Sequence, residues 1–175
     1  MLVILDRDGV INYDSEDYIK SPEEWVHIPG SLEAIAKLKQ SGFKVVVATN
    51  QSGIAKGLYS EAILHEIHAK MAQELKRLGV ELDGIFYCPH SPQDECSCRK
   101  PKPGMFLAIK DQFNEDFKES ICVGDSLRDI QAAQRAGSKS VLVLTGNGEK
   151  TLQKIEKSTI PVYSDLAEFV SKWLI

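Results

Sequence analysis

Short apolar runs alternate along the chain with longer segments in which apolar residues recur every three or four positions. The short runs are rich in Val, Ile and Leu and have the length of buried strands. The predicted strands are Leu2–Leu5, Phe43–Thr49, Gly84–Tyr87, Ile121–Val123 and Ser140–Leu144. The longer segments predict amphipathic helices between and after these strands. This alternation predicts an α/β fold in which helices cover both faces of a central, mostly parallel sheet.

Polar residues and glycines indicate where these helices begin and end. We expect Ser31 and Ser60 to be the N-caps of the first two helices, each of which ends at the next glycine. The last helix begins at Asp165, and Glu168 follows at the spacing of a capping box. The other predicted helices are Met105–Phe113, Leu127–Ala136 and a segment near Glu149–Lys157.

Residues 88–104 interrupt the alternation, since they hold four prolines, three cysteines and few apolar side chains. We interpret them as a loop. Three thiols and one imidazole are a ligand set suited to tetrahedral zinc, and they leave no position open for catalysis. The ligands would be Cys88, His90, Cys96 and Cys98, within a zinc-binding loop at about 88–98. The alternative is a loop with unconnected cysteines. Cys122 lies in a predicted strand and is expected to be a small core residue.

Two carboxylates, Asp6 and Asp8, directly follow the first predicted strand. At the carboxyl end of a buried strand they would lie together, so that one could attack phosphorus and the other could carry the proton. A divalent cation would offset their mutual repulsion. The alternative is a surface turn, which aspartate and the following Gly9 also favour.

Polar residues follow two further strands or precede helices. The hydroxyl of Thr49 and the backbone N–H groups up to Gly53 could hold phosphate oxygens, although this motif taken alone favours the alternative of a polar turn. Lys100, which precedes Pro101, could neutralise a phosphoryl group, and Arg99 could bind a second anionic group. The alternative for this pair is a solvated basic patch.

Asp125 and Asp129 follow the fourth predicted strand, four residues apart at the start of a helix. Their hard carboxylate oxygens suit Mg2+. The alternative is that Asp125 caps the helix, because aspartate favours that position.

The order of these motifs, from Asp6 to at least Asp129, resembles the haloacid dehalogenase superfamily of phosphotransferases, which has a three-layer Rossmann-like fold. The resemblance implies that Asp6 forms an aspartyl-phosphate, while Asp8 first protonates the leaving alcohol and then activates water. Thr49 and Lys100 would hold the transferring phosphoryl group. It further implies that Asp6, the backbone carbonyl of Asp8 and Asp125 bind Mg2+, with Asp129 supporting this site.

The loop and the segment after the second strand resemble a narrower group within this superfamily. Residues 88–105 are similar to the zinc loop of phosphatases that act on D,D-heptose 1,7-bisphosphate or on histidinol phosphate. Residues 49–57 resemble the heptose group more, since histidinol-phosphate relatives tend to have Asp where Ser52 stands. This resemblance implies removal of the C7 phosphate during synthesis of nucleotide-activated heptose, as for lipopolysaccharide. Zinc would then place Arg99 and Lys100 without joining the chemistry.

The substrate contacts that we expect come from three segments, and one position departs from the family pattern. The expected contacts are Asp14, Tyr18, Asn50, Gln51, Ser52 and Arg99. Many relatives carry a basic residue where Ser126 stands, so either Arg128 compensates or the remote phosphate is held less tightly. Residues 12–30 are expected to form a flap over Asp6, with ordinary packing as the alternative for Trp25.

The length and charge of the chain narrow the remaining possibilities. Its 175 residues fit one domain, and the 40 residues between Asp8 and Thr49 leave no room for a cap domain. A net charge of -4 and the lack of a basic stripe argue against nucleic acid, and therefore against a polynucleotide 3'-phosphatase. No run approaches the roughly 20 apolar residues of a membrane span, so we expect a cytoplasmic protein. We further expect a monomer that acts on a small phosphorylated sugar.

Two alternatives belong to other functional classes. A phospho-receiver also forms an aspartyl-phosphate, but it lacks the acid/base that Asp8 would supply. A zinc-binding module without catalysis would leave the acidic residues at 6, 8, 125 and 129 unexplained.

Overall fold

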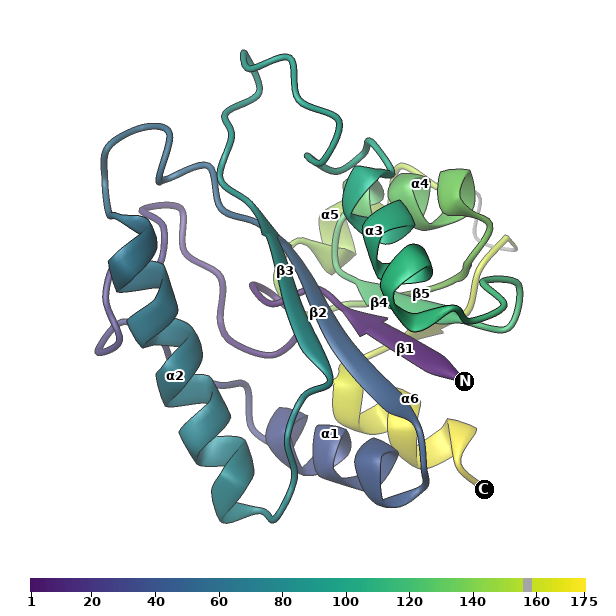
Figure 1. Cartoon of the computed structure of the whole chain (residues 1–175). Helices are drawn as coiled ribbons and strands as arrows, with labels where there is room; N and C mark the ends of the chain where they lie inside the picture. Colours follow the sequence, from purple (N-terminus) through teal and green to yellow (C-terminus); the bar gives the residue numbers. More distant parts are fainter. Residues whose placement is uncertain (156–158) are drawn as a thin grey trace.

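Six strands of the computed structural model, which describes residues 1–155 and 159–175, pair side by side in one parallel sheet. Their order across the sheet is β3-β2-β1-β4-β5-β6, so the chain starts in the middle and fills first one side and then the other (Figure 1). The strands are β1 (Leu2–Leu5), β2 (Lys44–Asn50), β3 (Gly84–Cys88), β4 (Ile121–Gly124), β5 (Lys139–Val143) and β6 (Val162–Tyr163). This order puts β1 and β4 side by side at the switch point, where ligands bind in such sheets.

Helices cover both faces of the sheet and form a three-layer structure (Figure 1). The helices are α1 (Ser31–Gln40), α2 (Glu61–Arg77), α3 (Gly104–Phe113), α4 (Leu127–Ala136), α5 (Gly148–Leu152) and α6 (Leu166–Trp173). Val3 and Leu5 of β1 belong to the core cluster shared with α1, α2 and α6. The alternate residues Leu2 and Ile4 belong to the cluster shared with α3 and α4. The strands are apolar on both sides for this reason, and the predicted α/β fold is confirmed.

The predicted helix starts are correct for α2 and α6 but wrong for α1. Ser60 caps α2 by accepting from the N–H of Ile63, and Asp165 caps α6 by accepting from Glu168. Helix α1 instead begins after Gly30, whose φ of 83° suits glycine. The Ser31 hydroxyl turns away and donates to the carbonyl oxygen of Ile11 at 2.7 Å. It therefore joins α1 to the loop after β1.

Two elements in the last third of the chain differ from the prediction. Strand β6 has only two residues and lies at the sheet edge, and no periodic pattern marks it. Helix α5 ends at Leu152, earlier than the predicted segment near Glu149–Lys157. Residues 156–158 of that segment lie outside the described residues.

Only part of the segment predicted to be a flap reaches the cavity at the strand ends. Trp25 is 1% exposed within the core, so the packing interpretation holds and its place in a flap was wrong. Lys70 of α2 donates to the carbonyl oxygens of Pro22 and Trp25 at 2.7 and 2.9 Å, which fixes this stretch beside α2 (Figure 1). Asp14 and Tyr18 do line the cavity.

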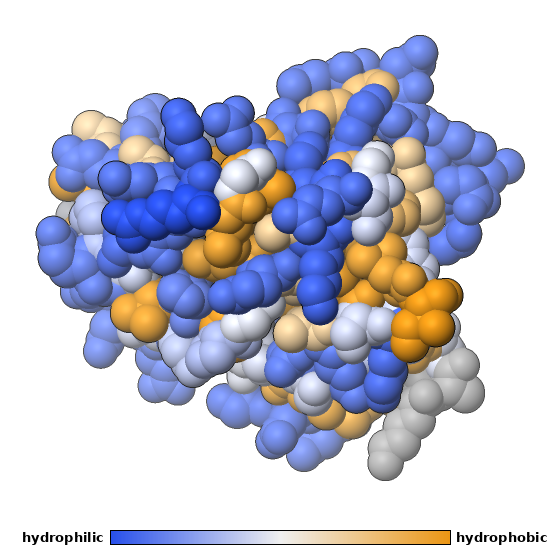
Figure 2. Space-filling view, turned by 90° about the horizontal axis from the view of Figure 1, so that it is seen from below, coloured by the Kyte–Doolittle hydropathy of each residue, from blue (hydrophilic) through white to orange (hydrophobic). Residues whose placement is uncertain are grey.

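Polar residues cover most of the face seen in Figure 2, and hydrophobic residues show between them in separate groups. No helix among the described residues is long and apolar enough to cross a membrane.

Candidate active site

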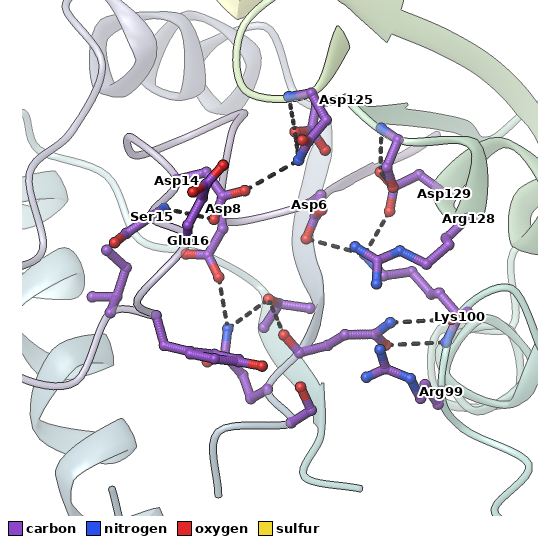
Figure 3. Close-up of a pocket in the computed structure, with 18 of the residues that line it drawn as sticks. Asp6, Asp8, Asp14, Ser15, Glu16, Arg99, Lys100, Asp125, Arg128 and Asp129 are labelled. Carbon is purple, nitrogen blue, oxygen red and sulfur yellow. Dashed lines mark hydrogen bonds and ion pairs between the residues drawn. The ribbon is translucent and has the colours of Figure 1, made fainter. Parts of the chain in front are cut away.

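The carboxyl ends of the central strands open into a cavity of about 270 Å³. Every residue predicted for catalysis, phosphoryl binding or substrate contact lines it. These residues are Asp6, Asp8, Asp14, Tyr18, Thr49, Asn50, Gln51, Ser52, Arg99, Lys100, Asp125 and Asp129. Figure 3 shows several of them pointing toward one another from β1, the β4–α4 turn and the loop before α3. The topology places them together because these parallel strands end at the same edge of the sheet.

Lys100 is the buried cation among the carboxylates of this cavity. Its Nζ lies 3.0 Å from Asp6 Oδ1 and 2.6 Å from Asp129 Oδ1, and it donates to the carbonyl oxygen of Ala48 at 2.8 Å. Burial alone would lower the pKa of Lys100, but Asp129 and Asp6 outweigh burial and raise it. Lys100 therefore stays charged beside Asp6.

Asp6, Asp125 and Asp129 offer carboxylate oxygens that all lie within 4.8 Å of one another. Burial, followed by repulsion from Asp129, raises the pKa of Asp6 well above its ordinary value. The same two causes raise the pKa of Asp125 to about 7. A single lysine does not balance three clustered carboxylates, and their hard oxygens are the ligands that Mg2+ prefers. The donor set therefore fits a divalent cation.

Backbone packing, together with hydrogen bonds, holds the Asp125 carboxylate. Its Oδ2 accepts from the backbone N–H of Asn147 at 2.8 Å. Gly9 and Gly146 have φ of +83° and +58°, and a Cβ on either would lie 2.2 Å from the same oxygen. Glycine at both positions lets the loops after β1 and β5 close on Asp125.

Asp129 and Ser126 form the capping box that starts α4. The Ser126 N–H and hydroxyl donate to Asp129 Oδ2 at 3.0 and 2.7 Å. Ser126 is thus the N-cap, so the interpretation of Asp125 as the cap was wrong. Asp125 is left with its carboxylate at the cavity.

Both oxygens of the Asp8 carboxylate accept hydrogen bonds from protein groups. Oδ1 accepts from Arg7 Nε at 3.0 Å and from Asn12 Nδ2 at 2.9 Å, while Oδ2 accepts from Gln51 Nε2 at 3.1 Å. Burial would raise the pKa of Asp8, but the Arg7 guanidinium and these hydrogen bonds lower it below its ordinary value. Asp8 is therefore held as an oriented carboxylate beside Asp6.

The two amides after Thr49 both bind protein groups as well as lining the cavity. The Asn50 side chain exchanges two hydrogen bonds with the backbone of Lys100, at 3.0 and 3.1 Å. Gln51 Nε2 also donates to Thr49 Oγ1 at 2.9 Å. Asn50 thereby ties the end of β2 to the loop that carries Lys100.

Positively charged side chains other than Lys100 also line the cavity. Arg99 and Arg128 both line it (Figure 3). Burial and the neighbouring charge of Arg128 lower the pKa of Arg99. Lys56 donates a short hydrogen bond to the hydroxyl of Tyr18 across the same opening. This arrangement offers a second anionic group several donors.

The predicted cysteine and histidine ligands also come together, at the end of β3 and in the loop that leads from it to α3 (Figure 1). The thiol sulfurs of Cys88, Cys96 and Cys98 and a ring nitrogen of His90 lie within 4.8 Å of one another. Burial raises the pKa of the Cys88 thiol to about 12, so its thiolate requires a nearby cation. Three sulfurs and one nitrogen fit a tetrahedral metal, and Arg99 follows the cluster directly in sequence.

Comparisons with known proteins agree with this geometry. Residues 1–137 match the family model of the haloacid dehalogenase-like hydrolases. The chain belongs to the haloacid dehalogenase-like hydrolase family.

Two relatives and one solved structure with high identity to this chain are named for the same activity. The D-glycero-beta-D-manno-heptose-1,7-bisphosphate 7-phosphatase of Bordetella bronchiseptica is 55% identical over 86% of this chain and 84% of the relative. Its counterpart from Pseudomonas putida is 52% identical over 95% of both chains. The crystal structure of D,D-heptose 1,7-bisphosphate phosphatase from B. bronchiseptica, complexed with magnesium and phosphate, superposes with a TM-score of 0.96 at 50% identity. That match covers 99% of this chain and 97% of the solved one.

Sequence reasoning missed several residues of this haloacid dehalogenase-like site. Arg7, Asn12, Lys56 and Asn147 each contact a predicted site residue or line the cavity, and His68 contacts Arg7 behind them. The helical spacing of the sequence could have indicated His68, because it places this residue on the same buried side of α2 as Leu64 and Met71. A polar residue on a buried stripe indicates a polar partner in the interior. No sequence pattern indicated Asn147, because its contact with Asp125 joins the loop after β5 to the turn after β4.

Proposed function

We propose that the chain is a magnesium-dependent phosphatase that removes the C7 phosphate of D-glycero-D-manno-heptose 1,7-bisphosphate through an aspartyl-phosphate. The observation that carries this proposal is the meeting of Asp6, Asp8, Thr49, Lys100 and Asp125 around one cavity. Relatives at least 52% identical over most of both chains are named for this reaction. The product, heptose 1-phosphate, is the form that nucleotide activation requires in lipopolysaccharide heptose synthesis.

Asp6 and Asp8 divide the chemistry in two steps. In the first, Asp8 takes up a proton from solvent as the negatively charged phosphate binds beside it. An oxygen of Asp6 then attacks phosphorus, the bond from phosphorus to the C7 oxygen breaks, and Asp8 gives that proton to the C7 oxygen. In the second, Asp8 takes a proton from water, which attacks phosphorus and frees Asp6 with release of phosphate. Lys100 and the Thr49 hydroxyl bind the phosphoryl oxygens throughout.

Asp6, Asp125 and the backbone carbonyl of Asp8 would hold Mg2+. The ion supplies positive charge that lets a phosphate approach the Asp6 carboxylate. Asp129 supports the site indirectly, because it fixes Lys100 at 2.6 Å and the start of α4 through Ser126. These residues make up one catalytic domain over 1–175, which we propose works as a monomer.

The second phosphate selects the substrate in this proposal. Arg99, with Arg128 beside it, would bind the C1 phosphate. The sugar would be contacted by other residues that line the cavity, namely Asp14, Tyr18, Asn50, Gln51 and Ser52. The relatives are named for the beta anomer, so we expect the same anomer here. In this proposal Arg128 supplies the positive charge that many relatives carry at the position of Ser126, because Arg128 also lines the cavity.

A substrate comparison tests this function. We expect kcat/KM for the beta-heptose bisphosphate to exceed that for the alpha anomer and for histidinol phosphate by at least about 10-fold. Phosphorus NMR of the product would show the C1 phosphate retained. Arg99→Ala should reduce the ratio of kcat/KM for the heptose bisphosphate to that for histidinol phosphate, because this change removes only a contact to the remote phosphate. Equal or faster hydrolysis of histidinol phosphate would assign the chain to the alternative function.

Removal of metal from the cysteine cluster is expected to lower activity, although this metal takes no part in the reaction itself. We propose zinc as the metal of Cys88, His90, Cys96 and Cys98, and the loop it fixes leads directly to Arg99. Chelated protein assayed with excess Mg2+ should lose about 10- to 100-fold in kcat/KM. Added zinc should restore activity, and Cys96→Ser should reproduce the loss. Unchanged turnover in the metal-free protein would contradict this role.

A further inference from the structure

Arg7 is a buried charged residue that lies between the two carboxylates of the first motif in sequence. Its side chain has no exposed surface. Besides the hydrogen bond from Nε, its Nη2 forms an ion pair with Asp8 Oδ1 at 2.9 Å. With Asn12 at 2.9 Å, three nitrogen atoms surround Asp8 Oδ1. Among the described residues Oδ2 accepts only from the amide of Gln51, at 3.1 Å, so it remains the oxygen with capacity to carry a proton.

His68 of α2 holds the far side of the Arg7 guanidinium. Arg7 Nη1 lies 3.2 Å from His68 Nε2, and the His68 side chain is nearly buried. A guanidinium can only donate, so Nε2 must be the unprotonated acceptor of this pair. Burial, with the charge of Arg7, lowers the pKa of His68 to about 3, which agrees with a neutral ring.

We propose that His68 is a positioning residue for proton transfer, acting through Arg7 to fix the Asp8 carboxylate so that Oδ2 exchanges the proton. The proposal rests on the acid/base role proposed for Asp8. Asp8 and Arg7 form a paired unit, and Asn12 and Gln51 contact it at the carboxylate end. The contact from α2 fixes that unit to a separate element of the fold, and orientation of this kind contributes to the rate.

The test uses His68→Phe, which keeps a ring in the same space and removes the acceptor. Two substrates are compared: an alkyl phosphate that the wild type hydrolyses, and 4-nitrophenyl phosphate, whose phenolate leaves without a proton. We expect kcat/KM for the alkyl phosphate to fall about 10- to 100-fold, mostly in kcat, because the acid is misplaced. The value for 4-nitrophenyl phosphate should stay within about 3-fold, since general acid catalysis contributes little there.

Three further variants complete the design. His68→Gln restores an acceptor and should recover most of the loss, whereas His65→Phe, on the exposed side of α2 beside Tyr87, should change neither substrate. His68→Leu removes the acceptor with a smaller side chain and repeats the comparison if the phenylalanine variant does not fold. Equal losses on both substrates, or none on either, would overturn the proposal.

The same assay separates this proposal from the proposed function. Wild-type protein that hydrolyses other alkyl phosphates but not the heptose bisphosphate would refute the substrate assignment alone. The comparison of leaving groups would then still decide the role of His68.

Discussion

Asp6→Asn is expected to lower phosphate release by at least about 10⁴-fold while leaving the fold intact. The amide has the shape of the carboxylate but cannot form the phosphoenzyme, and loss of a nucleophile is among the costliest changes to an enzyme. Lys100 keeps Asp129 as its partner at 2.6 Å, so its buried charge stays paired. Phosphate release and thermal unfolding measure the two parts of this prediction.

Asp111→Asn is the matched control for this variant, since it makes the same change on the exposed side of α3. Its activity should equal that of the wild type. Rapid quenching of the wild type during turnover should also yield a phosphorylated peptide that contains Asp6. More than about 1% residual activity in Asp6→Asn would exclude Asp6 as the nucleophile, given the size of the expected loss.

Lys100→Met is expected to reduce both stability and activity. Lys100 is 2% exposed and pairs with Asp6 and Asp129, so its removal leaves two carboxylates without their buried cation. Breaking a buried ion pair from one side costs about 3–5 kcal/mol in the free energy of unfolding. Without the charge on Nζ, phosphoryl transfer should slow by about 10²- to 10³-fold.

Urea unfolding and phosphate release measure these two losses separately. Lys118→Met, at an exposed position, is the control and should change neither. If Lys100→Met unfolds at the same urea concentration as the wild type, the carboxylates of Asp6 and Asp129 take up protons when the lysine is removed. In that case the ion pairs contribute little to stability.

The sequence predicts those parts of the fold that depend on local pattern. A run of apolar residues was enough to predict strand β1, and one polar side chain was enough to predict the N-cap of each of the helices α2 and α6. Ser31 failed as a cap because Gly30 takes that position and the hydroxyl finds the carbonyl of Ile11. That partner lies 20 positions away, so no local pattern encodes it.

The candidate site was predictable where residues follow strands and unpredictable where they meet across elements. Asp6 and Asp125 stand at strand ends, which the parallel topology brings together. The contact of His68 with Arg7 depends instead on how α2 packs, 61 positions from the first strand's loop. Trp25 was ambiguous for the same reason, since only tertiary packing separates a buried aromatic from one in a flap.

Three of the cavity residues that could contact the sugar or the remote phosphate lie on separate loops, apart from the strand ends that carry the chemistry. Tyr18 follows β1 by several residues, Lys56 lies between β2 and α2, and Arg99 lies between β3 and α3. Substitutions in these loops can change which alcohol the protein accepts without moving the nucleophile. New substrate preferences can therefore evolve in this scaffold one loop at a time, while the reaction itself is inherited unchanged.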